Sequence, residues 1–362
     1  MGEAAQAAAR RGHVSWLALP AGRIPALDRV IGELDAAQHV VLTTHVNADG
    51  DGAGSEVALA SWLHARGKRV HIVNPTPYPE AFRYLLDDEE LVVNLDDDRA
   101  EGVLATCDTL CVLDTGEWQR IGRVGCALAD RRIVVIDHHL PGGDPIPGAD
   151  VRDAAACATG ELIFDLVSRT GDALWPQPML VGIYTAILTD TGSFRFSNST
   201  PRAHAIAADL IARGVDPEEI YRRVYANVPL RRIALLRHAL ERLEVDPELP
   251  ITWISIERGI MESLGCTVDD LDGVVEHARS IEGTEVALLF RATGDGATKV
   301  SLRSSGSVDV NAIARRFGGG GHAKASGAVV GKPLPEGREE VLAAVREVVR
   351  QQRRRATHAG PG

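Results

Sequence analysis

The sequence predicts an α/β protein of two domains: an N-terminal domain built on a parallel sheet and a smaller α+β C-terminal domain. Three observations lead to this prediction. Short runs rich in β-branched residues alternate with helical stretches from residue 39 to residue 136, which is the rhythm of βαβ units. Beyond residue 248 the pattern changes to strands joined by turns. The length of 362 residues suits two ordinary domains.

Four strands are predicted in the N-terminal domain, at residues 39–44, 69–73, 109–113 and 132–136. The helix between the first two strands is expected to begin at Gly54-Ser55 and to end at Gly67, because glycine is favoured directly after the last turn of a helix. Two further helices are predicted to begin at Thr200-Pro201 and at Asp216-Pro217, since a capping side chain followed by proline is typical of a helix N-terminus.

The C-terminal half has a different organisation. Residues 229–244 carry Leu and Ile at three- and four-residue spacing with charges between them, which predicts a helix connecting the domains. The segments 251–256, 285–292 and 298–304 are predicted strands, the last two joined by a hairpin turn, so antiparallel pairing is expected. The predicted boundaries are a flexible tail at 1–25, the N-terminal domain at 26–226, a linker helix at 227–248, the C-terminal domain at 249–348 and a basic flexible tail at 349–362.

The composition excludes several classes of protein. The 39 Lys and Arg residues are outnumbered by 50 Asp and Glu residues, and the net charge of −11 argues against a protein that coats long duplex nucleic acid. No apolar run approaches the ~18 residues needed to cross a bilayer and the N-terminus lacks a signal-peptide core, so we expect a cytoplasmic protein that binds no membrane. The five cysteines form no C-x-x-C pair, which argues against a zinc knuckle.

Acidic and imidazole side chains follow three of the predicted strands. His45, Asp49 and Asp51 follow the first, Asp114 follows the third, and residues 137–139 (Asp-His-His) follow the fourth. Because the carboxyl ends of parallel strands meet at one edge of a sheet, and ligands of open α/β folds bind there, we expect these side chains to converge. The apolar segment 179–188, if helical, would bring Asp190 to the same place at its negative end, which favours a cation.

This set of residues predicts a site for two divalent cations. Asp49, Asp51, Asp114 and Asp190 together carry a charge of −4, which two such cations would neutralise. With His45 and His138 as nitrogen ligands the set suits Mn²⁺ best, with Mg²⁺, Co²⁺ or Zn²⁺ as alternatives. Asp114, at the sheet centre, is the expected shared ligand. Each motif alone also suits a helix cap or a tight turn, and it is their conjunction that favours the metal site.

The motifs around these residues resemble those of a known family. HVNADGDG (45–52), LD (113–114), DHH (137–139) and TDTGSF (189–194) are similar to the four signature motifs of the DHH phosphoesterase family. FGGGGHAKASG (317–327) resembles the motif of the DHH-associated C-terminal domain. The resemblance is closest to the NrnA-like subgroup, and it implies hydrolysis of very short single-stranded oligoribonucleotides and of 3′-phosphoadenosine 5′-phosphate (pAp), and in some members of cyclic di-AMP or its linear product pApA. It also implies a homodimer.

The resemblance assigns roles to individual residues. One cation would be held by His45, Asp49 and Asp114, and the other by Asp51, Asp114, His138 and Asp190, while His139 would lie near the scissile phosphate. There His139 would stabilise the transition state or protonate the leaving oxygen. Asp137 is expected to orient an imidazole through its ring N–H, with a turn-capping role as the alternative. Ala48 and Gly52 depart from the usual Pro and Ala of the first motif, but neither removes a ligand.

The C-terminal motif implies a substrate-binding role. The run Gly318 to Gly321 lacks the Lys-Ser/Thr of a nucleotide P-loop, but successive glycines can present N–H groups to an anion. The resemblance implies that Gly319, Gly320, Gly321 and His322 bind phosphate or ribose across an interdomain cleft, a flexible hinge being the alternative. Arg303 is the predicted partner of a second phosphate, although an ordinary surface arginine fits as well. A short cleft of this kind would accept roughly two to five nucleotides and would exclude long polymers.

Two other functions share part of this pattern. A manganese pyrophosphatase or exopolyphosphatase would use similar first motifs, but the basic Ser-Arg-Lys-Lys-Gln stretch of the pyrophosphatases is absent. A RecJ-like exonuclease for long substrates would need a further nucleic-acid-binding domain, for which 362 residues leave no room. A non-catalytic nucleotide-binding module would be expected to have lost metal ligands, and every predicted ligand is present.

Overall fold

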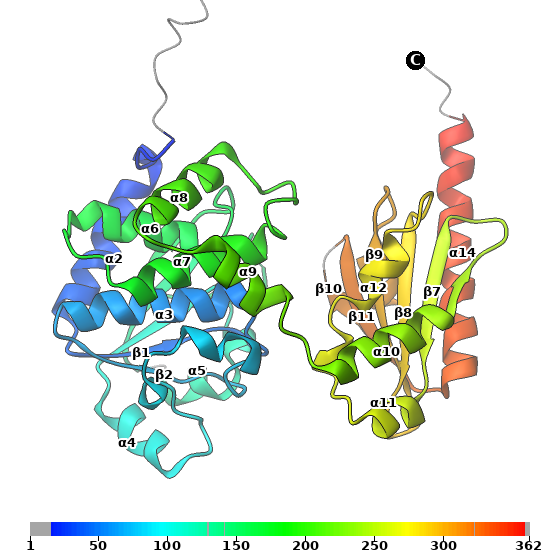
Figure 1. Ribbon diagram of the computed structural model, residues 1–362, viewed down its shortest axis with the longest axis horizontal. Helices are drawn as coiled ribbons and strands as arrows, with labels where there is room; N and C mark the ends of the chain where they lie inside the picture. The colour runs from blue at the N-terminus through cyan, green and yellow to red at the C-terminus, as the bar shows by residue number, and fades with distance from the viewer. Residues whose placement is uncertain (1–15, 129, 141, 322, 359–362) are drawn as a thin grey trace, which may run out of the picture. The chain divides into compact units, whose positions relative to one another are not determined.

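The computed structural model describes residues 16–128, 130–140, 142–321 and 323–358. The chain divides into two compact units between Asn227 and Val228, and each unit consists of a sheet with helices packed on it (Figure 1). The sequence analysis ends the N-terminal domain at residue 226, next to this division. Among the described residues, no helix has the length and apolar composition that crossing a membrane requires.

The first unit is built on a five-stranded parallel sheet, as the sequence predicts. The strand order is β2-β1-β3-β4-β5, and every neighbouring pair is parallel. The strands are β1 (His39–Thr43), β2 (Arg69–Ile72), β3 (Thr109–Leu113), β4 (Arg132–Asp137) and β5 (Ala149–Arg152). Strand β5 was not predicted, because its four residues Ala-Asp-Val-Arg include only one β-branched side chain and it becomes a strand through pairing with β4 at the sheet edge.

Helices cover both faces of this sheet. On one face, α2 (Ile24–Ala36), α3 (Gly50–Ala65) and α6 (Thr159–Thr170) pack on the strands. In the same apolar core, α7 (Gln177–Asp190), α8 (Pro201–Ala212) and α9 (Pro217–Tyr225) pack outside them. The other face packs against α4 (Asp98–Thr106) and α5 (Gly122–Leu128). Short 3-10 helices are η1 (Ala21–Arg23), η2 (Glu80–Leu85), η3 (Glu89–Leu91) and η4 (Trp118–Ile121). Alternate residues of β1 divide between the two cores, since Val40 and Leu42 face the first group and Val41 faces the second.

The predicted start of α3 was wrong. The helix begins at Gly50, four residues before the predicted Gly54, because the Asp49 side chain accepts hydrogen bonds from the backbone N–H groups of Asp51 and Gly52. The predicted starts of α8 and α9 are confirmed: Thr200 caps the first and Asp216 caps the second.

Helices α3 and α7 approach at backbone contact. A Cβ atom added at Gly54 would lie 2.5 Å from the carbonyl oxygen of Gly182, and one added at Gly182 would lie 2.5 Å from the carbonyl oxygen of Gly54. Only glycine permits this separation at both positions. The close approach matters for the site, because α3 carries Asp51 in its first turn and α7 ends at Asp190.

The second unit contains a six-stranded sheet of order β10-β11-β9-β8-β7-β6. Its strands are β6 (Leu243–Val245), β7 (Ile251–Ile256), β8 (Val286–Ala292), β9 (Thr298–Ser304), β10 (Gly320–Gly321) and β11 (Ala325–Val330). The predicted hairpin of β8 and β9 is confirmed. Antiparallel pairing holds except between β7 and β8, which are parallel because the chain crosses over between them through α11 (Arg258–Leu264), η5 (Asp269–Leu271) and α12 (Val274–Arg279).

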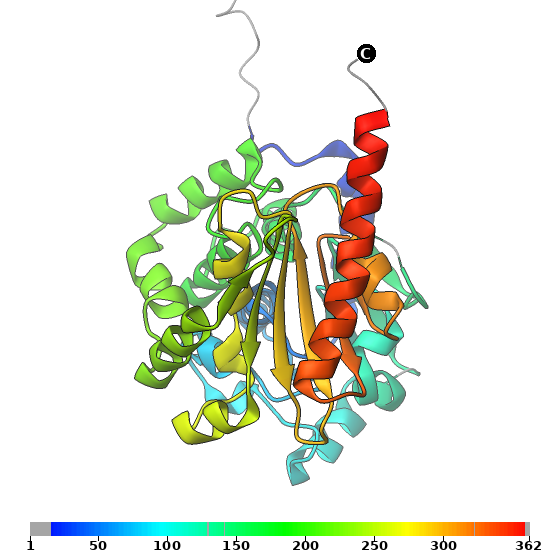
Figure 2. The same ribbon diagram turned by 90° about the vertical axis from the view of Figure 1, so that its right-hand side faces the viewer.

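Helices lie on both faces of the second sheet as well. The long helix α14 (Leu334–His358) lies along one face together with α13 (Val310–Arg315) (Figure 2). On the other face, α10 (Leu230–Glu241) buries Leu235 and Ala239 against Ile254 and Ile256 of β7. The helix that the sequence analysis treats as a linker therefore packs as part of the second unit.

Both predicted tails contain ordered structure. In the predicted tail 1–25, residues 21–25 belong to η1 and α2, and Arg23 is buried in ion pairs. In the predicted tail 349–362, α14 continues to His358, since Val345 and Val349 extend its apolar stripe onto the sheet. Residues 1–15 of the predicted N-terminal tail and residues 359–362 of the predicted C-terminal tail lie outside the described residues.

Candidate metal centre

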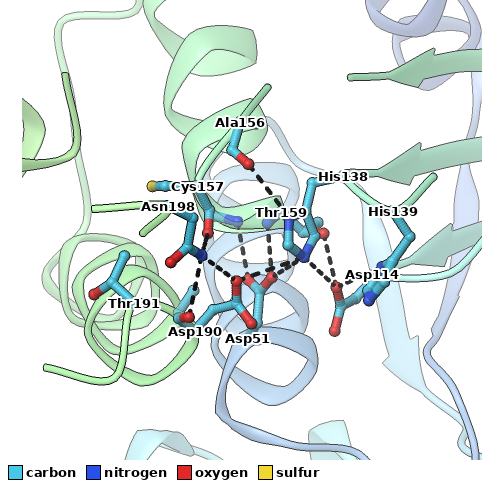
Figure 3. Close-up of polar contacts among 12 residues, drawn as sticks. Asp51, Asp114, His138, His139, Ala156, Cys157, Thr159, Asp190, Thr191 and Asn198 are labelled. Atoms are coloured by element: carbon cyan, nitrogen blue, oxygen red, sulfur yellow. Dashed lines mark hydrogen bonds and ion pairs between the residues drawn. The ribbon is translucent and has the colours of Figure 1, made fainter. Parts of the chain in front are cut away.

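The structure brings the six predicted metal-ligating residues to one edge of the first sheet. His45 follows β1, Asp114 follows β3 and His138 follows β4, while Asp190 is the last residue of α7. Asp49 and Asp51 lie at the N-terminus of α3. Three groups have ligand atoms within 4.8 Å of one another: His45 with Asp49 and Asp114, Asp51 with His138 and Asp190, and Asp114 with His138 and His139. Figure 3 shows the side chains of the latter two groups pointing toward one another.

The first group is centred on His45. Its Nε2 lies 3.4 Å from Oδ2 of Asp114 and 3.8 Å from Oδ2 of Asp49. Its Nδ1 donates to the carbonyl oxygen of Val46 at 3.0 Å, which assigns the ring proton of the neutral imidazole to Nδ1. The lone pair of Nε2 therefore faces two carboxylates, an arrangement that suits a cation between them.

The second group surrounds His138. Its Nε2 lies 3.5 Å from Oδ2 of Asp51, 3.5 Å from Oδ1 of Asp114 and 3.7 Å from Oδ2 of Asp190. The Nδ1 atom donates to the carbonyl oxygen of Ala156 at 3.4 Å. Nε2 is buried and has no hydrogen-bond partner among the described residues. A buried ring nitrogen that faces three carboxylates without a hydrogen bond is placed as a ligand of a divalent cation would be.

Burial and mutual repulsion perturb the carboxylates of the centre. Burial, together with the charge of Asp114, raises the pKa of Asp51 well above its ordinary value. Burial and the charges of Asp49 and Asp190 likewise raise the pKa of Asp114, and burial raises the pKa of Asp190. The fold thus holds carboxylates where their ionised forms are disfavoured without a cation, a pattern typical of functional sites.

Asp114 is the residue that joins the two groups. Its Oδ2 faces His45, while its Oδ1 faces both His138 and His139. Its backbone has a φ of 60°, in the left-handed region that Asp tolerates better than most residues. This geometry directs the two oxygens to different imidazoles, as a ligand shared by two cations requires.

A turn that the sequence analysis did not single out supports these side chains. Asp51 accepts hydrogen bonds from the backbone N–H groups of Thr159 (2.7 Å) and Gly160 (3.0 Å) at the N-terminus of α6. The Thr159 hydroxyl donates to Oδ1 of Asp114 at 3.0 Å. Asn198 donates to Oδ2 of Asp190 at 3.0 Å. The Thr-Gly-Glu sequence at 159–161 before an apolar run indicates a helix start, but the sequence offers no sign that its N–H groups meet Asp51.

Asp137 and His139 form a separate pair beside the centre. Oδ1 of Asp137 accepts from Nδ1 of His139 at 2.9 Å and from its backbone N–H at 3.1 Å. The first contact orients an imidazole and the second caps the turn, so both interpretations of Asp137 fit the geometry. Burial acts to raise the pKa of Asp137, but the hydrogen bonds from His139 outweigh it and the pKa is lowered. A carboxylate at Nδ1 leaves Nε2 of His139 as the ring atom available to a substrate.

The predicted substrate-binding residues lie in the second unit. Arg303, on β9, donates to Oε1 of Glu276 at 3.1 Å. Gly320 and Gly321 form β10, so this part of the glycine run is a strand and not the predicted loop. A Cβ at Gly319 would lie 2.1 Å from the carbonyl oxygen of Gly327, which explains the need for glycine there by packing alone. His322 lies outside the described residues.

Aspartates and histidines gathered at the carboxyl edge of a parallel sheet form a site suited to divalent cations, as in metal-dependent hydrolases. Residues 39–188 match the DHH family, N-terminal domain, and residues 257–351 match the DHHA1 domain. The chain belongs to the DHH family and carries its DHHA1 domain.

Named relatives cover nearly the whole chain. The bifunctional oligoribonuclease and PAP phosphatase NrnA of Thermus thermophilus is 34% identical over 311 residues, covering 85% of this chain and 89% of the relative. The protein of the same name from Bacillus subtilis is 28% identical and covers 80% of this chain and 89% of the relative. A solved structure of an exopolyphosphatase-related protein from Bacteroides fragilis has a TM-score of 0.83 at 25% identity, covering 91% of this chain and 96% of that chain.

Proposed function

We propose that this protein is a metal-dependent phosphoesterase that hydrolyses short oligoribonucleotides and removes the 3′-phosphate of pAp. The observation that carries the proposal is that each carboxylate oxygen of Asp114 faces a histidine Nε2, and that Nε2 of His138 is buried without a hydrogen-bond partner among the described residues. The names of the Thermus thermophilus and Bacillus subtilis relatives support the choice of substrates.

The residues of the centre would hold two divalent cations, with Asp114 common to both. His45 and Asp49 complete one ligand set, and Asp51, His138 and Asp190 complete the other. Four carboxylates with two imidazoles favour Mn²⁺ over the harder Mg²⁺, while Co²⁺ and Zn²⁺ suit the imidazoles too. When bound, such cations neutralise the non-bridging oxygens of a phosphate and lower the pKa of a water molecule.

The chain's own contribution to the reaction would come from His139 and Asp137. With the Nδ1 proton held by Asp137, the Nε2 atom of His139 would donate a hydrogen bond or a proton to the phosphate when the ring is protonated. The ring is partly exposed, with a side-chain exposure of 30%, so a substrate can reach it. Asp137, with its lowered pKa, keeps the charge that stabilises the protonated ring.

In the second unit, Arg303 is proposed to contact a phosphate group of the substrate, and Gly319, Gly320, Gly321 and His322 to contact its phosphate or ribose. Arg303 lines a cavity of about 150 Å³ together with Arg291, Lys299 and Asp272, so cationic side chains outnumber acidic ones there, which favours an anion. A homodimer and a location in the cytoplasm stay predictions from the sequence.

The test is hydrolysis of a substrate panel by protein stripped of metal and reloaded with Mn²⁺. The panel contains pAp, pApA, a five-nucleotide RNA, cyclic di-AMP and pyrophosphate, with products separated by chromatography. We expect mononucleotides from pApA and the short RNA, and AMP from pAp. No hydrolysis of these three by the reloaded protein would overturn the proposal.

A second candidate is a pyrophosphatase or exopolyphosphatase. It is favoured by the fold shared with the exopolyphosphatase-related protein of Bacteroides fragilis at a TM-score of 0.83. Faster release of orthophosphate from pyrophosphate than of AMP from pAp in the same panel would select this second function.

A further inference from the structure

The residues of the His138 group share one support, which is the turn formed by residues 156–160. The backbone of this turn donates to Asp51 from Thr159 and Gly160, and the Thr159 hydroxyl donates to Asp114. At the other end of the turn, the carbonyl oxygen of Ala156 accepts from Nδ1 of His138.

Asp190 is tied to the same turn through Asn198. The Asn198 amide donates to Oδ2 of Asp190 at 3.0 Å and to the carbonyl oxygen of Cys157 at 2.9 Å (Figure 3). Every residue of the ligand set around His138 therefore has a hydrogen bond to the turn or to a side chain bound to it. By contrast, His45 donates to the carbonyl oxygen of Val46 and Asp49 accepts from the first turn of α3, so neither bonds to the turn.

Arg23 holds the turn at both ends. Its Nε donates to Oδ2 of Asp153, before the turn, and its Nη1 donates to Oε1 of Glu161, after the turn, each at 2.7 Å. Glu161 in turn accepts from the backbone N–H of Cys157 at 3.0 Å through its other oxygen. Asp153 also accepts from the backbone N–H of Ala155 at 2.9 Å. The guanidinium thus bridges two carboxylates that each fix part of the turn.

The cluster around Arg23 is buried. Arg23 is 6% exposed and Glu161 is 1% exposed. Arg202 and Asp165 complete the cluster: Arg202 lies 3.2 Å from Glu161 and pairs with Asp165, which also accepts from Arg23. Buried ion pairs contribute little net stability once desolvation is counted, but they fix geometry when each donor is matched to an acceptor.

We propose that Arg23 is a positioning residue for the metal centre: by clamping Asp153 and Glu161 it sets the turn 156–160 and thereby the ligands around His138. The inference rests on the proposed function, because it takes Asp51, Asp114, His138 and Asp190 to be one cation's ligands. The side chain of Arg23 bonds to Asp153, Glu161 and Asp165 and not to these four, so its effect passes through the turn. The other cation would share only Asp114 with the turn, because His45 and Asp49 have supports outside it.

The test is Arg23→Lys, which keeps the charge but loses the planar fork that reaches two carboxylates at once. The matched control is Arg169→Lys. Arg169 makes a bidentate pair with Asp28 at 2.7 and 3.0 Å, and links α6 to α2 as Arg23 links the turn to η1, but it lies on the surface away from the turn. Calorimetric titration of metal-stripped protein with Mn²⁺ and thermal unfolding in EDTA are measured for both variants and the wild type.

We expect two Mn²⁺ ions bound by the wild type and by Arg169→Lys. In Arg23→Lys, one of the two is expected to bind about 10–100-fold more weakly, as for loss of a residue that orients metal ligands, while the other, which has only Asp114 in contact with the turn, is expected to lose much less affinity. Glu161→Gln keeps an oxygen for the Cys157 N–H but faces Arg23 with an amide, and it should weaken the same site. This second variant decides the matter if circular dichroism shows Arg23→Lys to be unfolded.

The results separate the inference from the function on which it rests. Two Mn²⁺ ions bound with unchanged affinity by both the Arg23 and the Glu161 variant would overturn the positioning role alone. Equal weakening of both ions, in step with a fall in the unfolding temperature, would also overturn it, because that is the effect of a general loss of structure. A wild type that binds no Mn²⁺ would overturn the proposed function, and the inference with it.

Discussion

Replacing Asp114 by asparagine is expected to change stability in opposite directions in the metal-free and the Mn²⁺-loaded protein. Asn matches Asp in shape, is well tolerated at a φ of 60° and can still accept the hydrogen bond from Thr159. The substitution therefore removes one negative charge from the centre with little change in packing.

The size of the effect follows from the spacing of the ligand atoms. Two ionised carboxylates with oxygens 4.8 Å apart, the limit within each ligand group, repel by about 3 kcal/mol at an effective dielectric constant of about 20. Proton uptake relieves part of this cost, in keeping with the raised pKa of Asp114. We expect a gain on the order of 2 kcal/mol for the metal-free variant, or a rise of roughly 4–8 °C in unfolding temperature.

With Mn²⁺ present, the wild type is expected to be more stable than Asp114→Asn. A cation at 100 times its Kd stabilises a protein by about 2.7 kcal/mol, and a 100-fold loss of affinity removes most of this. Scanning fluorimetry in EDTA and in increasing Mn²⁺ measures both effects, with Asp87→Asn as the control for the same substitution at an exposed position. Two results would refute the electrostatic reasoning. One is a metal-free Asp114→Asn protein with a lower unfolding temperature than the wild type, and the other is a variant whose unfolding temperature rises with Mn²⁺ as much as that of the wild type.

Three further predictions concern packing and pH. Gly182→Ala should destabilise the protein by about 1–3 kcal/mol in urea unfolding, since its Cβ would meet the Gly54 carbonyl oxygen at 2.5 Å. Gly32→Ala is the control, because its Cβ would meet nothing within 4 Å, and equal effects of the two would contradict the packing argument. Burial raises the pKa of Glu56 to about 8, so the folded state favours the neutral carboxyl. The stability that Glu56 contributes to the folded state is therefore full below pH 4.5 and is lost as pH rises through 8. The stability of wild type relative to Glu56→Gln should therefore fall over that range, and a flat difference would contradict it. Burial and the nearby His39 lower the pKa of His71 to about 4. The stability that His71 contributes to the folded state is therefore present above pH 6.5 and is lost as pH falls toward 4. His71→Asn should flatten the loss of stability over that interval, measured as urea midpoints, and an unchanged slope would count against this assignment.

The sequence was informative where a local pattern carries the structure. Runs of β-branched residues predicted β1, β3 and β4, and parallel pairing then required His45, Asp114 and His138 to meet at one edge, as they do. Capping residues predicted the starts of α8 and α9 for the same reason, because a cap acts within a single helical turn. The predicted start of α3 at Gly54 was wrong, since Asp49 caps the helix and it begins at Gly50.

Other parts of the site depend on contacts between distant residues, which no local pattern records. Arg23 looks like part of an Ala- and Arg-rich tail in the sequence, yet it is buried against Glu161, 138 residues away. The glycine run near 320 suggests an anion-binding loop, whereas pairing with β11 makes Gly320 and Gly321 a strand.

By itself, the sequence determined which residue types reach the carboxyl edge of the sheet, because strand direction and residue order fix that outcome. The tertiary structure alone decided how the ligands are held: the α3–α7 approach at Gly54 and Gly182 and the turn 156–160 follow from how whole helices pack. The physical reason is range, since backbone propensity and capping act over a few residues, whereas burial and ion pairing act between any residues that the fold brings together.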